Sequence, residues 1–216
     1  MGGAAFAEGA AIAATVVATV GALPQVRRTL ASGDVRGVSV TSPSLGIATE
    51  LAWVGYAVHE RLWSALPEAV LMVVANVVLV VVLCRAGSAM RVAVPAATAW
   101  GTVLGVTAVL GAPAAIAALL GLAYAVQVGP AVWCAYRART PAGVARATWL
   151  LLALESALWF IYATAHADPA TLTFAAIGIA ASAAILLRTR AFPILTTLGC
   201  AQRNQVSEES LISASG

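Results

Sequence analysis

Lysine is absent from the 216 residues, and only 10% of them are charged. A soluble domain carries charge on about a quarter of its residues, so water is excluded as the solvent for most of this chain. All positive side chains other than the two histidines are arginines, which lie mainly in short segments without interleaved aromatic residues. This pattern argues against nucleic acid as a partner. With 61% hydrophobic residues, the sequence predicts a protein that has lipid as its solvent.

Cysteine is also scarce. Cys84, Cys134 and Cys200 form an odd set without metal-ligand spacing, so the sequence predicts free thiols and no metal. We find no nucleophile elbow, phosphate loop or paired-histidine motif, and the sequence therefore predicts neither an enzyme nor a cofactor. The first apolar run carries Glu8 and follows no basic residue, so we expect a retained helix rather than a cleaved signal peptide.

Apolar runs long enough to cross about 30 Å of hydrocarbon recur along almost the whole chain. Charges, glycines and prolines divide them into seven segments, at 7–25, 43–58, 66–83, 92–110, 113–136, 147–165 and 169–187. Only Gly111 and Pro113 separate the fourth segment from the fifth, so six spans is the competing count.

Arginine placement is an independent guide to topology, because positive residues prefer the cytoplasmic ends of spans. Arginines lie in the first, third and fifth connections and after the last segment, whereas the second connection has only Arg61, beside Glu60 and Glu68. This alternation favours seven spans, with the N-terminus outside and the C-terminus in the cytoplasm. The arginine-rich and alanine-rich composition favours a bacterial plasma membrane. Residues 201–216 are polar and rich in serine, and we predict a disordered cytoplasmic tail at 191–216.

An internal repeat runs through the chain at a spacing of 106 residues (130 − 24). The uncommon residue types that recur at this spacing are Pro24 with Pro130, Gly37 with Gly143, Trp53 with Trp159 and Tyr56 with Tyr162. Three spans in a repeat would insert the second copy upside down, and the fourth span restores its direction. We therefore predict an all-α membrane protein of seven transmembrane helices, arranged as two parallel three-helix bundles (3+1+3) with an inversion linker helix. The domains are then a first repeat at 1–87, a linker helix at 88–111, a second, degenerate repeat at 112–190 and the tail at 191–216.

The stretch LPQVRRTLASGDVRGVSV, residues 23–40, is followed by Trp53, Tyr56 and Asn76. This pattern resembles the PQ-loop repeat of the SWEET and PQ-loop (MtN3/saliva) transporter superfamily. The second copy, residues 129–187, is degenerate, because Ala131 follows its proline and Ser182 stands opposite Asn76. The resemblance implies facilitative transport of a small polar solute, above all a mono- or disaccharide sugar, by alternating access between two repeats.

The resemblance also implies roles for individual residues. Trp53 and Asn76 would line the substrate pocket, with Trp159 and Ser182 in the equivalent positions. Their indole faces and polar groups suit a sugar ring, which offers an apolar face and a rim of hydroxyls. A serine at this depth equally serves helix packing, and the asparagine equally bonds a neighbouring helix.

Gating residues follow from the same resemblance, which implies a ring of four prolines at the inner gate. This chain supplies Pro24, beside Gln25, together with Pro43 and Pro130, while Trp149 occupies the fourth place. A proline within a span removes a backbone hydrogen bond and lets the helix swing, although each proline could simply kink a packed helix. The outer gate would be formed by Tyr56 and Tyr162, which could equally be interfacial anchors.

Glu50 and Glu155 are carboxyl groups within the second and sixth spans, one helical turn before the two tryptophans. An apolar setting favours the protonated form of such a group, so either residue could take part in proton coupling or could hydrogen-bond a neighbour such as Thr49. A second interpretation is therefore a proton-coupled transporter of amino acids or other zwitterions, of the PQ-loop type.

A third interpretation is a membrane receptor or scaffold similar to the KDEL receptor, because fold alone does not fix function. The absence of arginine from the middle of every predicted span weighs against it. The expected partners are a small-molecule solute and the lipid bilayer, and two repeats in one chain require no homo-oligomer.

Overall fold

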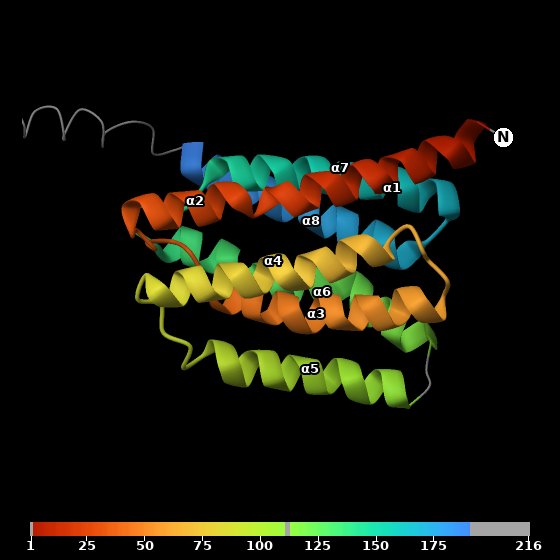
Figure 1. Ribbon diagram of the computed structural model, residues 1–216, viewed down its shortest axis with the longest axis horizontal. Coiled ribbons are helices and arrows are strands. Elements are labelled where there is room, and N and C mark those ends of the chain that lie inside the picture. Colours follow the sequence, from red (N-terminus) through yellow and green to blue (C-terminus); the bar gives the residue numbers. More distant parts are fainter. Residues whose placement is uncertain (1, 111–112, 191–216) are drawn as a thin grey trace, which may run out of the picture.

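The computed structural model describes residues 2–110 and 113–190, and every regular element in these ranges is an α-helix. The helices are α1 (Gly2–Gly21), α2 (Leu23–Ser32), α3 (Thr41–His59), α4 (Leu66–Arg85), α5 (Ala93–Val109), α6 (Pro113–Arg137), α7 (Arg146–His166) and α8 (Pro169–Arg190). α1 and α2 lie end to end, and the chain reverses direction at each later connection (Figure 1). The predicted tail at 191–216 lies outside the described residues.

The outer surface of the bundle identifies its solvent. Five helical segments are long and apolar enough to cross a membrane: Phe6–Ser32, Leu66–Arg85, Ala115–Arg137, Arg146–His166 and Pro169–Arg190. α5 is a shorter apolar helix, and α3 is not among the five. Large apolar side chains are exposed on α1 and on every helix from α3 to α8, among them Val16, Leu51, Val74, Val103, Leu122, Leu150 and Leu187. Apolar surface of this extent requires lipid, and the chain is an integral membrane protein.

Most predicted spans agree with a helix to within three residues at each end. The first, 7–25, agrees at its start with the apolar segment Phe6–Ser32, but its end is wrong, because α2 continues beyond Gln25 to Ser32. Arg27 and Arg28 suggested the end of a span but lie on the helix. Their long side chains can extend from a helix end toward the polar boundary of the membrane. Cys84 and Cys134 are free thiols, as predicted.

Local chemistry sets several helix ends. Pro169 begins α8, where its missing N–H costs nothing, and Asp168 before it accepts hydrogen bonds from the Ala170 N–H (3.0 Å) and the Thr171 hydroxyl (2.6 Å). α2 ends where Gly33 takes a φ of +63°, a left-handed conformation that glycine adopts without strain.

The helices pack in the same order within each half of the chain. α4 contacts both α1 and α3, and α8 contacts both α6 and α7. Between the halves, α1 packs on α7 and α3 packs on α6, while α5 lies at one edge against α3 (Figure 1). α1 buries a row of small side chains, Ala7, Ala11, Ala14 and Ala18. Small residues allow the close approach on which helix packing in membranes depends.

Candidate functional site

A small cavity lies between the two halves, close to the end of the bundle where α3 finishes and α4 and α8 begin. It is lined by Glu50, Trp53, Ala57, Ala65, Glu68, Ala69, Trp159, Thr171 and Phe174. Its volume is about 40 Å³, enough for roughly two or three water molecules. A sugar ring does not fit without an outward movement of the surrounding helices. We name this end of the bundle the arginine-poor end and the opposite one the arginine-rich end.

Trp53 and Trp159 line the cavity from equivalent helices. Each packs edge-on against the tyrosine that follows it by three residues. The ring centroids of Trp53 and Tyr56 are 5.6 Å apart at 82°, and those of Trp159 and Tyr162 are 5.3 Å apart at 87°. The match in spacing therefore extends to a match in side-chain geometry.

Each tryptophan also contacts the third helix of the other half. Trp53 lies 5.9 Å from Phe174 of α8, centroid to centroid, whereas the Trp159 indole donates a hydrogen bond of 2.7 Å to Glu68 Oε1 of α4. Phe174 and Glu68 are themselves 106 residues apart (174 − 68). The matched position on the third helix of each half is thus acidic in α4 and apolar in α8.

Three buried carboxyl groups surround this region, with exposed fractions of 7% for Glu50, 7% for Glu68 and 4% for Glu155. The Glu68 and Glu155 side chains are hydrogen-bonded to each other across α4 and α7, and Glu50 is hydrogen-bonded to Gln127 of α6. The arginines and histidines in the described parts of the chain lie at helix ends, in connections or on the short helix α2. The three carboxyl groups therefore have no cationic partner within the spans.

Sequence reasoning missed two of these residues. Glu68 falls within the predicted span 66–83 and counted only as one of the charges near Arg61, whereas it is a buried carboxyl group in the first turn of α4. Pro67 marked this helix start, because proline favours the first turn. Gln127, 6% exposed, was not singled out, although a lone amide within an apolar run is costly unless it has a partner.

Asn76 and Ser182 lie apart from the residues that line the cavity. Asn76 is eight residues further along α4 than Glu68, about 12 Å closer to the arginine-rich end. It packs against Gly46 of α3, where a Cβ would come within 2.7 Å of Asn76 Nδ2 and 2.9 Å of Gln127 Nε2. Asn76 Nδ2 and the fully buried Ser182 hydroxyl have no hydrogen-bond partner among the described residues. They are polar groups that an enlarged cavity would expose.

The arginine-rich end is closed by two connections, 33–40 and 138–145, which we name the paired loops. Gly143 donates its N–H to Arg36 O at 3.0 Å, and a Cβ on Gly143 would lie 2.6 Å from Asp34 O. On the other side, a Cβ on Gly37 would lie 3.0 Å from Pro141, and its φ of +78° also favours glycine. The glycines matched by the repeat therefore let each loop contact the other.

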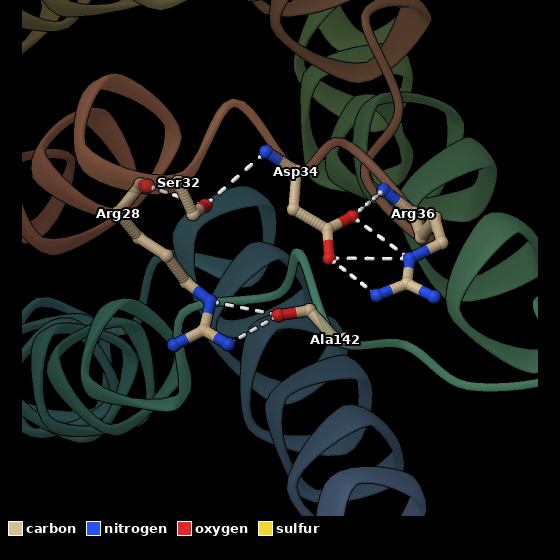
Figure 2. Close-up of polar contacts among 5 residues, drawn as sticks. All are labelled: Arg28, Ser32, Asp34, Arg36 and Ala142. Atoms are coloured by element: carbon tan, nitrogen blue, oxygen red, sulfur yellow. Dashed lines mark hydrogen bonds and ion pairs between the residues drawn. The ribbon is translucent and has the colours of Figure 1, made fainter. Parts of the chain in front are cut away.

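Side chains of α2 hold the paired loops together. Gln25 donates to Gly143 O at 3.0 Å and accepts from Ala145 N–H at 2.9 Å. Arg28 donates to Ala142 O with two of its nitrogens (Figure 2). Asp34 and Arg36 form an ion pair within the first loop at 2.7 Å, and this hydrogen bond lowers the pKa of Asp34.

The predicted gating prolines differ in their local setting. Pro24 follows the break between α1 and α2, and Pro130 lies inside α6. Pro43 lies in the first turn of α3, where the N–H of any residue lacks a helical partner. Trp149, at the fourth position, packs in the first turn of α7 with Ala135, Val144 and Ile185. Of the three prolines, Pro130 therefore interrupts a helix along its length, whereas Pro24 and Pro43 lie in the first turns of their helices.

The predicted gating tyrosines also differ. Tyr162 is 3% exposed, and its hydroxyl lies 3.4 Å from Ser64 Oγ in the connection between α3 and α4. It therefore covers Trp159 at the arginine-poor end. Tyr56 is half-buried and lines a separate apolar groove of about 520 Å³ between α3, α5 and α6.

These features define a helical integral membrane protein with a polar centre between two similarly packed groups of helices. Comparisons with models of protein families, with curated proteins and with solved structures find no match for this chain. The function is therefore argued from the residues and their geometry.

Proposed function

We propose that this protein is a carrier that moves a small polar solute by opening the two ends of one central chamber in turn. The chamber lies between two parallel three-helix repeats, one containing α1 to α4 and the other α6 to α8, with α5 as the linker. The arginine-rich end faces the cytoplasm, in line with the preference of positive residues for that side.

One observation carries this proposal: the contacts between the halves are related by the same 106-residue spacing as the sequence. Trp53 meets Phe174 as Trp159 meets Glu68. The packing of α1 on α7 corresponds to that of α6 on α3. Two equivalent groups of helices around a central polar region support a mechanism in which the groups rock against each other.

The closed arginine-rich end and the cavity near the opposite end fit one state of such a cycle. The paired loops seal one side through backbone contacts and the hydrogen bonds of Gln25 and Arg28. On the other side, Tyr162 packs on Trp159 and contacts Ser64 in the connection between α3 and α4. Solute entry would require separation at the arginine-poor end first, and release into the cytoplasm would require separation of the paired loops.

Sugar is the substrate class that we propose. Two indole rings flank the cavity, and aromatic faces suit the apolar face of a sugar. The Trp53 indole N–H and Asn76 Nδ2 are buried without hydrogen-bond partners in the described structure. A buried polar group without a partner costs about 1–3 kcal/mol, and sugar hydroxyls would supply the missing partners. The second candidate is a proton-coupled carrier of a zwitterion, and the three buried carboxyl groups favour it.

Uptake of radiolabelled glucose and sucrose into proteoliposomes tests the proposal. We expect equilibrative uptake by the native protein, lost in Asn76→Ala and retained in Thr102→Ala. Thr102 is the matched control, because its hydroxyl is exposed and bonds only to Thr98 O of the same helix. If neither sugar enters, sugar is rejected as the substrate, and amino acids are screened under an imposed pH gradient.

A further inference from the structure

The contact between Glu68 and Glu155 requires a proton. Glu68 Oε1 accepts the Trp159 indole N–H at 2.7 Å, Glu68 Oε2 is buried, and the Thr15 hydroxyl and the Glu155 carboxyl group both lie at the Glu68 side chain. An ionised carboxylate accepts hydrogen bonds and cannot donate them. The hydrogen bond between the two carboxyl groups therefore exists only while one of them is protonated.

A second observation points to a polar occupant beside this pair. Trp53 is 9% exposed and lines the same cavity as Glu68, and its indole N–H has no partner among the described residues. The cavity volume of about 40 Å³ admits a few waters. Water there would satisfy the indole and would connect the carboxyl pair to the arginine-poor end.

We propose that Glu68 and Glu155 form a proton-binding site shared between the two repeats, and that loss of its proton weakens the contact between α4 and α7. One carboxylate takes up a proton delivered through the cavity and becomes a carboxyl donor to the other. When the proton returns to water, two adjacent carboxylates remain and repel each other. The site would thereby link proton binding to the separation of the repeats at the arginine-poor end.

The groups that face this pair come from every neighbouring helix. α3 contributes the Glu50 carboxyl group, and α6 contributes the Tyr124 hydroxyl. α1 contributes the Thr15 hydroxyl at this level, and its Glu8 lies at the outer end, 3.3 Å from His166 of α7. α8 contributes the Thr171 hydroxyl, which donates to Asp168. These neighbours supply negative or neutral groups at the level of the pair, so a proton is the cation that offsets its charge.

The inference that proton binding drives solute movement rests on the proposed carrier function, but proton binding itself does not. The test therefore measures cavity opening without any solute. Ala69, 5% exposed, lines the cavity one residue after Glu68. We would place Ala69→Cys in a chain with serine at positions 84, 134 and 200 and measure its modification by a maleimide in proteoliposomes between pH 5 and pH 8.

Thiol reactivity rises with pH by itself, so the comparison is with Ala69→Cys combined with Glu155→Gln. The neutral amide keeps the shape of the pair but cannot be ionised. We expect the modification rate to rise severalfold more steeply with pH in the chain that retains both carboxyl groups. Ala69→Cys with Glu50→Gln, which leaves the pair intact, should keep the steeper rise.

Equal pH dependence with and without Glu155→Gln would overturn the proposal. A measurement of carboxyl infrared absorption on the same samples guards against a folding defect. The signal of a protonated carboxyl group should be present in the native protein at pH 7 and reduced in Glu155→Gln, and an unchanged signal would also overturn the proposal.

Steep pH dependence without uptake of any sugar would reject the sugar carrier and retain the proton site. Sugar uptake with no difference between the variants would do the reverse.

Discussion

Gly143→Ala should open the arginine-rich end. Its added Cβ would lie 2.6 Å from Asp34 O, 2.8 Å from Arg36 O and 2.9 Å from Arg36 N. These are backbone atoms of the opposite loop, so no side-chain rotation relieves the contact. Gly143 does not have a positive φ, and the clash alone therefore determines the effect.

The free-energy cost of Gly143→Ala in the closed state follows from the contacts that must separate. Overpacking of a closed site costs about 1–3 kcal/mol. The same movement weakens the Gly143 N–H bond to Arg36 O and the Gln25 bond to Gly143 O, each contributing about 1 kcal/mol. Together these contributions amount to about 3–5 kcal/mol, and the lower figure would raise the population of the open state roughly a hundredfold.

Accessibility of a buried thiol within the paired loops measures this opening. Ser39 is 6% exposed, and Ser39→Cys in the chain without native cysteines should react slowly with a maleimide applied at the arginine-rich end. Adding Gly143→Ala should raise the rate by one to two orders of magnitude. Gly129→Ala is the matched control, since its Cβ meets nothing within 4 Å. Equal rates for the Gly143 and Gly129 variants would refute the closure of this end by the paired loops.

Three further predictions concern stability in detergent. Trp159→Phe removes the donor of the 2.7 Å hydrogen bond to Glu68 of α4. The free energy of unfolding should fall by about 1–3 kcal/mol, which corresponds to a fall in Tm of roughly 2–10 °C. Trp53→Phe is the control, because it removes an N–H that has no partner among the described residues and should lower Tm less. Gln25→Ala leaves a buried carbonyl and a buried N–H of the second paired loop without partners. The free energy of unfolding, measured by thermal unfolding, should fall by about 2–4 kcal/mol. A fall no larger than that of a substitution at an exposed position would contradict the role of this side chain. Asp34→Asn should remove a small, pH-dependent stabilisation, because the hydrogen bond from the neighbouring guanidinium lowers the pKa of Asp34 below 3.8. Stabilisation by that pair is complete above the unfolded pKa and disappears as the pH falls through the folded pKa, so the difference in Tm between native and variant should vanish in strong acid, and a constant difference would contradict this assignment.

The helices could be predicted from the sequence because their signals are local. Apolar length identifies the spans, and Pro169 after Asp168 identifies the start of α8. The end of α2 could not be read in this way. Arg27 and Arg28 suggested a boundary, but arginine side chains extend far enough for their helix to continue.

The repeat was the most informative feature of the sequence. Its spacing paired Gly37 with Gly143, and the structure supplies the physical reason, since each glycine lies against the opposite loop. The same spacing relates Phe174 to Glu68, a pair that sequence reasoning could not recognise because the two residues share no chemistry. Contacts made by dissimilar residues become visible only when the helices are placed in space.

The site was predictable only in part. Trp53 and Trp159 line the cavity, but Asn76 and Ser182 do not. Depth along a helix follows from residue number, whereas the face that a side chain presents depends on how its helix rotates against neighbours. The burial of Glu68 likewise depends on α1 and α7, which are distant in sequence.

Counterflow of labelled glucose tests the central claim most directly. Proteoliposomes loaded with unlabelled glucose are diluted into a trace of labelled glucose, and a carrier that exposes one chamber to each side in turn produces a transient accumulation of the label. We predict this overshoot for the native protein and its loss in Asn76→Ala. Entry no faster than in protein-free liposomes, or entry without an overshoot, would contradict a sugar carrier that works by alternating access.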